Sequence, residues 1–128
     1  MKNASLLLLL TLITFSCEDT GDLSTENNLV GTWVLIAKLD NPDFEGNTFE
    51  IIESDLQITF NLDRSFVANG AICAFESSLE VDGHYSLTDP TINSSDGTIR
   101  NYSLIDDELI IECPCDGTVP CLRKYGRL

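Results

Sequence analysis

Short segments in which apolar and polar residues alternate recur along the chain, and this pattern constrains the fold most strongly. Residues 56–61 (LQITFN) would place Leu56, Ile58 and Phe60 on one face of an extended strand. A turn follows, and residues 65–69 then predict the second strand of a hairpin. Because turn residues are frequent and no segment has a convincing amphipathic-helix spacing, the pattern predicts an all-β sandwich or barrel.

The remaining strands are expected over residues 29–39, 81–87, 99–104, 108–113 and 121–128. The first of these segments is long enough for a helix, but it is rich in β-branched and aromatic residues, which favour a strand. Asp106 and Asp107 lie between two of the segments and mark a second hairpin. Asp89-Pro90 and Asp96-Gly97 mark turns on either side of an expected polar loop.

The chain begins with the features of a signal peptide. Lys2 precedes an apolar run over residues 6–15, which is too short for a transmembrane helix of about 20 residues. Ser16 is small enough to precede a cleavage site, and Cys17 comes next. Residues 1–16 are therefore predicted to be a signal peptide that the mature protein lacks.

Residues 13–17 (ITFSC) resemble the bacterial lipobox, in which the cysteine after a small residue is diacylated and becomes the new N-terminus. The resemblance implies a lipid anchor on Cys17, and two or more acyl chains hold a protein stably at a membrane. The alternative is an ordinary secretory signal with an incidental cysteine. Glu18, Asp19 and Asp22 follow at once and resemble the surface-export signal of lipoproteins in the Bacteroidetes group. This implies the outer face of the outer membrane, whereas without such a signal the protein would face the periplasm.

The rest of the chain divides into a tether and one domain. Residues 17–28 are acidic and polar, so we expect a disordered tether, followed by a single β domain over residues 29–128. The net charge is −14 at pH 7, and it becomes −15 without residues 1–16, which contain one lysine and no acidic residue. Such a chain repels phosphate backbones and anionic lipid. We therefore expect no nucleic-acid partner and no membrane contact other than the anchor.

Residues 29–33 (LVGTW) match the Gly-x-Trp opening of lipocalins and of small lipocalin-like bacterial lipoproteins. The first hairpin, the segment 83–85 (GHY) and the basic, aromatic final strand are also similar to that family. The resemblance implies that the domain is a small up-and-down antiparallel barrel. It also implies that an arginine of the last strand, Arg123 or Arg127, packs over Trp33, which is a cation–π contact.

The same resemblance implies that the barrel binds a small apolar or amphipathic ligand, and the sequence contains no catalytic constellation, so we expect no enzyme activity. Combined with the alternation of apolar residues, it makes seven side chains candidates for lining a ligand cavity: Trp33, Leu35, Phe60, Phe66, Tyr85, Tyr102 and Leu109. An eight-stranded barrel is only just wide enough to hold one small ligand or to be filled by its own side chains. The alternative is therefore a filled barrel that binds a protein partner at the cell envelope, as an accessory or inhibitor module.

Four cysteines lie in the domain: Cys73, Cys113, Cys115 and Cys121. In a small exported domain, four cysteines suggest two disulfides. Cys113 and Cys115 are separated by one residue, which makes a bond between them awkward. We predict Cys113–Cys121 with Cys73–Cys115, and the alternative is Cys73–Cys113 with Cys115–Cys121.

We expect no catalytic residue, metal or cofactor. His84 is the only histidine, and neither a nucleophile nor an orienting carboxylate is placed beside it by the sequence. A zinc site made of the four domain cysteines is disfavoured because zinc ligands usually have two or more residues between them, and Cys113 and Cys115 have one. Residues 41–47 have the spacing of a calcium loop, but Ile52 stands where a glutamate is needed.

Overall fold

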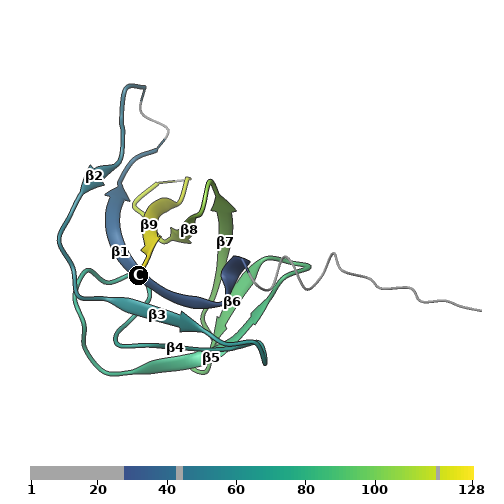
Figure 1. Ribbon diagram of the computed structural model, residues 1–128. Helices are drawn as coiled ribbons and strands as arrows, with labels where there is room; N and C mark the ends of the chain where they lie inside the picture. The colour runs from purple at the N-terminus through teal and green to yellow at the C-terminus, as the bar shows by residue number, and fades with distance from the viewer. Residues whose placement is uncertain (1–27, 43–44, 118) are drawn as a thin grey trace, which may run out of the picture.

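The computed structural model describes residues 28–42, 45–117 and 119–128. Within these ranges it has nine strands, β1 (Gly31–Leu39), β2 (Glu50–Ile51), β3 (Gln57–Phe60), β4 (Ser65–Ala68), β5 (Val81–Ser86), β6 (Thr91–Ser94), β7 (Ile99–Ile105), β8 (Glu108–Cys113) and β9 (Cys121–Arg127) (Figure 1). The predicted all-β class is confirmed. The predicted signal peptide, Cys17 and the tether up to residue 27 lie outside the described residues. No helix in the described part of the chain is long and apolar enough to cross a membrane.

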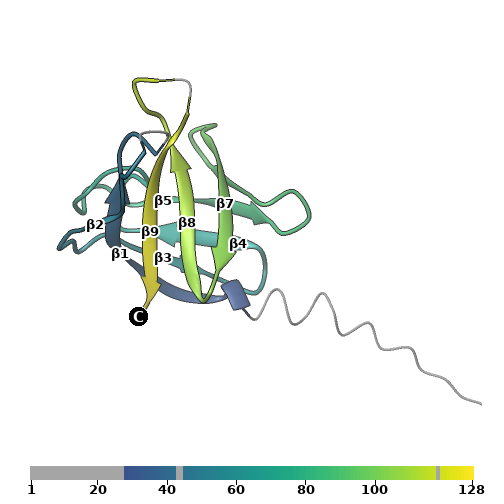
Figure 2. The ribbon, with the colours of Figure 1, turned by 90° about the horizontal axis from the view of Figure 1, so that it is seen from above.

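Eight of the strands close into an antiparallel up-and-down barrel (Figures 1 and 2). From β3 to β9 each strand pairs with the next, and β1 closes the ring by pairing with both β3 and β9. β2 adds a short pairing to the far half of β1, at Ala37 and Lys38. This is the architecture that the likeness to lipocalins implies, so the predicted barrel is confirmed.

β1 is long and curved, which lets it serve as the seam of the barrel (Figure 1). Residues 31–34 pair with β3, and residues 33–39 pair with β9. The ladder with β9 shifts register between Leu35 and Ala37. Such a bulge bends a strand and increases its twist, and both changes help a sheet to close on itself.

Both predicted hairpins are present, and the residues of each turn have the backbone angles or hydrogen bonds that stabilise it. Asp106 and Asp107, between β7 and β8, have positive φ angles of 51° and 62°, as a two-residue hairpin turn requires at both central positions. Between β3 and β4, the Asp63 carboxylate accepts a hydrogen bond from the Ser65 amide at 3.0 Å. These local contacts hold each pair of strands in register.

The polar loop predicted between Asp89-Pro90 and Asp96-Gly97 is wrong, because residues 91–94 form β6. β6 pairs with both β5 and β7, and its one apolar residue, Ile92, is fully buried. Gly83 of β5 allows the close approach, since a Cβ atom there would lie 2.1 Å from the Asn93 carbonyl oxygen. A strand with a single inward apolar side chain has no alternation that sequence can detect, and the ladder decides its structure.

Arg127 ties together three parts of the chain at one end of the barrel. Its guanidinium carbon lies 4.2 Å from the centre of the Trp33 ring, so of the two arginines that the resemblance allows, Arg127 makes the cation–π contact. The same guanidinium donates hydrogen bonds to the carbonyl oxygens of Asn28 and Val30 and to the Asp107 carboxylate. The last strand is thereby fastened to the segment before β1 and to the β7–β8 turn.

Candidate functional site

The structure brings all seven predicted ligand-lining side chains together inside the barrel. Each is at most 9% exposed, and all of them belong to one apolar cluster. The Phe60 ring packs against Phe66 and Tyr85, with centroid distances of 6.1 and 5.2 Å. The Tyr85 hydroxyl donates to the Asn61 carbonyl, and the Tyr102 hydroxyl donates to that of Ser86. These side chains therefore pack on one another as a core, and their predicted role in ligand binding stays a prediction.

The barrel interior is also closed off by residues 69–80, which join β4 to β5 and which we call the cap loop. Ile72 of this loop is only 5% exposed and belongs to the core. The Tyr125 hydroxyl, inside the barrel, donates to the Ile72 carbonyl at 2.6 Å. Outside, Asp55 accepts hydrogen bonds from the amide and hydroxyl of Ser77. Hydrogen bonds from inside the barrel and on its outer side thus both fix the position of the cap loop.

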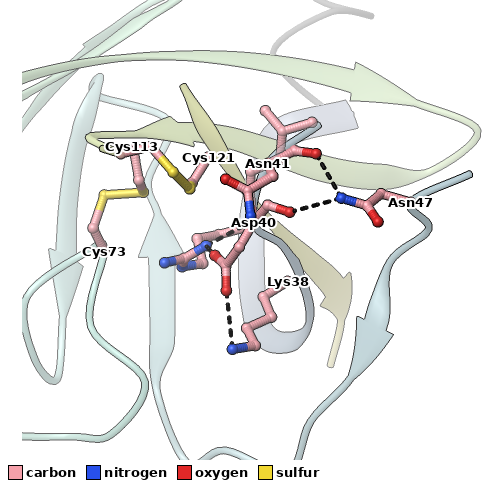
Figure 3. Close-up of a disulfide and its surroundings, with 10 residues drawn as sticks. Lys38, Asp40, Asn41, Asn47, Cys73, Cys113 and Cys121 are labelled. Carbon is pink, nitrogen blue, oxygen red and sulfur yellow. Dashed lines mark hydrogen bonds and ion pairs between the residues drawn. A yellow bond between two sulfur atoms is a disulfide. The ribbon is translucent and has the colours of Figure 1, made fainter. Parts of the chain in front are cut away.

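A disulfide between Cys73 and Cys113 fixes the cap loop to the end of β8, and a second between Cys115 and Cys121 closes the β8–β9 connection (Figure 3). The predicted pairing of Cys113 with Cys121 and of Cys73 with Cys115 is wrong, and the alternative is observed. Cys113 and Cys121 lie directly opposite each other in the β8–β9 ladder. Such pairs hold their Cβ atoms about 4.5–5.5 Å apart, whereas a disulfide needs about 3.5–4.5 Å.

Beside the disulfides, two cations lie against the ring of Phe75 in the cap loop, and one carboxylate pairs with both cations. The Arg123 guanidinium and the Lys38 ammonium lie 4.5 and 5.2 Å from the ring centre. Asp40 binds both, at 3.0 Å from Lys38 Nζ and 3.2 Å from Arg123 Nη1 (Figure 3 shows Asp40 beside Lys38). The hydrogen bond from Lys38, aided by the charge of Arg123, lowers the pKa of Asp40 below its usual value. This cluster fastens the cap loop to β1 and β9.

The buried tyrosines make the fold sensitive to alkali. Burial raises the pKa of Tyr102 to about 12, and it also raises the pKa of Tyr125. Since an unfolded tyrosine ionises near pH 10, the stability that neutral Tyr102 contributes is complete below about pH 10 and is lost as the pH rises towards 12.

We therefore expect Tyr102→Phe to lose less stability than the wild type between pH 10 and pH 12. At pH 7 the variant should be less stable by about 1 kcal/mol, because it lacks the hydrogen bond to Ser86. Urea unfolding followed by circular dichroism at pH 7, 10 and 11.5 measures both effects. Parallel pH curves for the two proteins would contradict the expectation.

The outside of the barrel carries a hollow of about 380 Å³ over β7, β8 and β9, which we call the outer hollow. It is lined by Phe49, Ser103, Ile105, Glu108, Ile110, Glu112, Leu122 and Lys124. Lys124 Nζ lies 4.2 Å from the Phe49 ring centre and 3.4 Å from the Glu108 carboxylate, so this cation is already engaged. No sequence motif marks the outer hollow. The signal that could have revealed it is the run of Leu109, Ile110 and Ile111. A strand that is buried on one face only should alternate apolar and polar residues, so this run indicates an apolar side chain on the outer face.

His84 faces solvent from the outside of β5 and lines a different, polar hollow with Asp82 and Asn93. Among the described residues, no group of three or more histidine, cysteine, aspartate or glutamate side chains is arranged to hold a metal ion. The outer hollow, by contrast, offers the apolar side chains of Phe49, Ile105, Ile110 and Leu122 to another molecule.

A scan against models of protein families finds no match to this chain, and searches of curated proteins and of solved structures find no similar protein. The barrel architecture and the contacts described above are therefore the basis for a functional proposal.

Proposed function

We propose that this chain is a lipid-anchored extracytoplasmic protein whose filled barrel binds a protein partner at the cell envelope through its outer surface, without catalysis. The observation that carries this proposal is the packed interior, in which the seven candidate lining side chains contact one another beneath the cap loop. A ligand inside the barrel would have to separate these packed side chains. Their separation would cost the free energy that their burial contributes. Binding at the outer surface has no such cost.

Native mass spectrometry of the mature lipidated protein, released from its membrane in mild detergent, tests this proposal. We expect the mass of residues 17–128 with the acyl groups on Cys17, lighter by the four hydrogens lost to the two disulfides. A small molecule that accompanies the folded protein and is lost on denaturation would contradict the filled barrel. It would instead support the second candidate function, which is binding of an apolar or amphipathic ligand inside, as the likeness to lipocalins implies.

The anchor rests on the sequence of residues 13–17 and is tested in cells. We expect the wild-type protein to incorporate an alkyne-labelled fatty acid and to sediment with the outer membrane, because diacylation anchors a protein stably. Cys17→Ala should lose both the label and the membrane association, while Cys73→Ala, as a control for other cysteines, should keep them. Protease treatment of intact cells then distinguishes the cell surface, which we propose, from the periplasmic face.

A further inference from the structure

The outer wall of the barrel carries a group of apolar side chains at a place where strand alternation predicts polar ones. Ile105, Ile110 and Leu122 come from three neighbouring strands and meet in the outer hollow, and Ile105 is 56% exposed. Phe49, from the segment before β2, forms a further wall. Exposed apolar residues are ordinary when they are scattered, whereas apolar residues from several elements gathered in one hollow indicate an interaction site.

The charge at the outer hollow is acidic. Glu108 and Glu112 line it, and the one lining cation, Lys124, is paired with Glu108 and stacked on Phe49. Asp106 follows Ile105 directly and is exposed. The whole chain has a net charge of −14. An occupant of this surface is therefore favoured when it carries positive charge beside its apolar groups.

We propose that the outer hollow binds a segment of a partner protein that presents aliphatic side chains between lysine or arginine side chains. The inference rests on the proposed function and deepens it by naming the surface and the chemistry of the partner. A second copy of this chain is a poorer occupant, since two chains of charge −14 repel each other. An anionic lipid surface is disfavoured by the same charge.

The size of the outer hollow agrees with this kind of occupant. Its volume of about 380 Å³ is at the small end of the range of about 300–1,000 Å³ for pockets that enclose a whole ligand. A hollow of this size on an open wall suits one or two anchoring side chains, as in the centres of protein interfaces. The acidic residues around it would then contact the basic residues that flank those anchors.

Fluorescence anisotropy with two labelled peptides of equal length tests the proposal on the mature lipidated protein in detergent. One peptide alternates leucine and lysine, and the other alternates leucine and glutamate. We expect the leucine–lysine peptide to bind and the leucine–glutamate peptide not to bind. Ile105→Thr and Ile110→Thr should each weaken binding about tenfold, because each removes an apolar contact at the centre of the site. Glu112→Gln should weaken binding and reduce its dependence on salt.

Ile99→Thr is the matched control. Ile99 is on the same strand as Ile105, is 59% exposed against 56%, and does not line the outer hollow. Peptide binding that depends only on the overall negative charge would be equally strong in all three isoleucine variants, and that result would overturn the proposal. Equal binding of the two peptides would overturn it as well. Circular dichroism confirms that each variant is folded.

Photo-crosslinking in cells distinguishes two outcomes: that the outer hollow is not the binding surface, and that the proposed function itself is wrong. A crosslinking amino acid at position 105 or 99, or at Leu62 in the β3–β4 turn, reports which surface a partner touches. A partner captured from position 105 alone, with a lysine- or arginine-rich contact segment, supports the outer hollow. A partner captured only from Leu62 overturns the outer hollow but leaves the proposed function standing. Absence of any crosslinked protein, together with a retained small molecule in mass spectrometry, overturns both.

Discussion

Replacing Trp33 with alanine should lower the free energy of unfolding by about 3–5 kcal/mol, which is much of the stability of a domain of this size. The indole is completely buried and belongs to the core. Its Nε1 donates to the Leu29 carbonyl at 2.9 Å, and Arg127 stacks on its face at 4.2 Å. The substitution therefore leaves a cavity, an unpaired carbonyl and an arginine without its aromatic partner.

Urea unfolding followed by circular dichroism measures this loss, since Trp33 is the only tryptophan and its fluorescence disappears with it. Val34→Ala is the control on the same strand, because Val34 points away from the core and is only half-buried. It should cost about 1 kcal/mol or less. If both variants unfolded at the same urea concentration, the placement of Trp33 at the centre of the core would be wrong.

Removing the disulfide that holds the cap loop should have an effect of similar size. Cys73 and Cys113 are 40 residues apart in sequence, and a crosslink that closes a loop of this length contributes about 4 kcal/mol by restricting the unfolded chain. The double variant Cys73→Ala with Cys113→Ala should lose this contribution. Alanine is the suitable replacement because Cys113 is buried, and a serine hydroxyl there would need a hydrogen-bond partner.

The second disulfide provides the matched comparison. Cys115 and Cys121 are 6 residues apart, so their crosslink should contribute only about 2 kcal/mol. Denaturant unfolding of the two double variants, each with its remaining disulfide confirmed by mass spectrometry, should rank them in that order. A larger loss in the Cys115→Ala, Cys121→Ala variant would mean that the short crosslink, and not the cap-loop crosslink, dominates the stability.

The strands that sequence predicted best are those whose inward residues alternate without interruption. β3 follows the pattern of residues 56–61, and every second side chain in it is apolar and buried. This works because alternation is a local property: successive side chains of an extended chain point to opposite faces, whatever the rest of the fold does. The turn at Asp106 and Asp107 was predictable for the same reason, since it depends on the residues within it.

Other features depend on which distant segments meet, and the local sequence does not contain that information. β6 exists because β5 and β7 supply hydrogen-bond partners on both sides of residues 91–94. The outer hollow forms because Phe49 reaches β9, which is far from it in sequence. The local sequence of β6 gives no indication of a strand. The outer hollow is indicated only by the run of apolar residues in β8.

The sequence by itself determined the all-β class, the inward faces of the main strands, the two hairpins and the presence of four cysteines suited to two disulfides. Only the tertiary structure decided which cysteines pair, which arginine covers Trp33 and whether the predicted lining residues pack on one another. The physical reason is distance along the chain. Cys73 reaches Cys113, and Tyr125 reaches Ile72, only after the cap loop has folded over the end of the barrel.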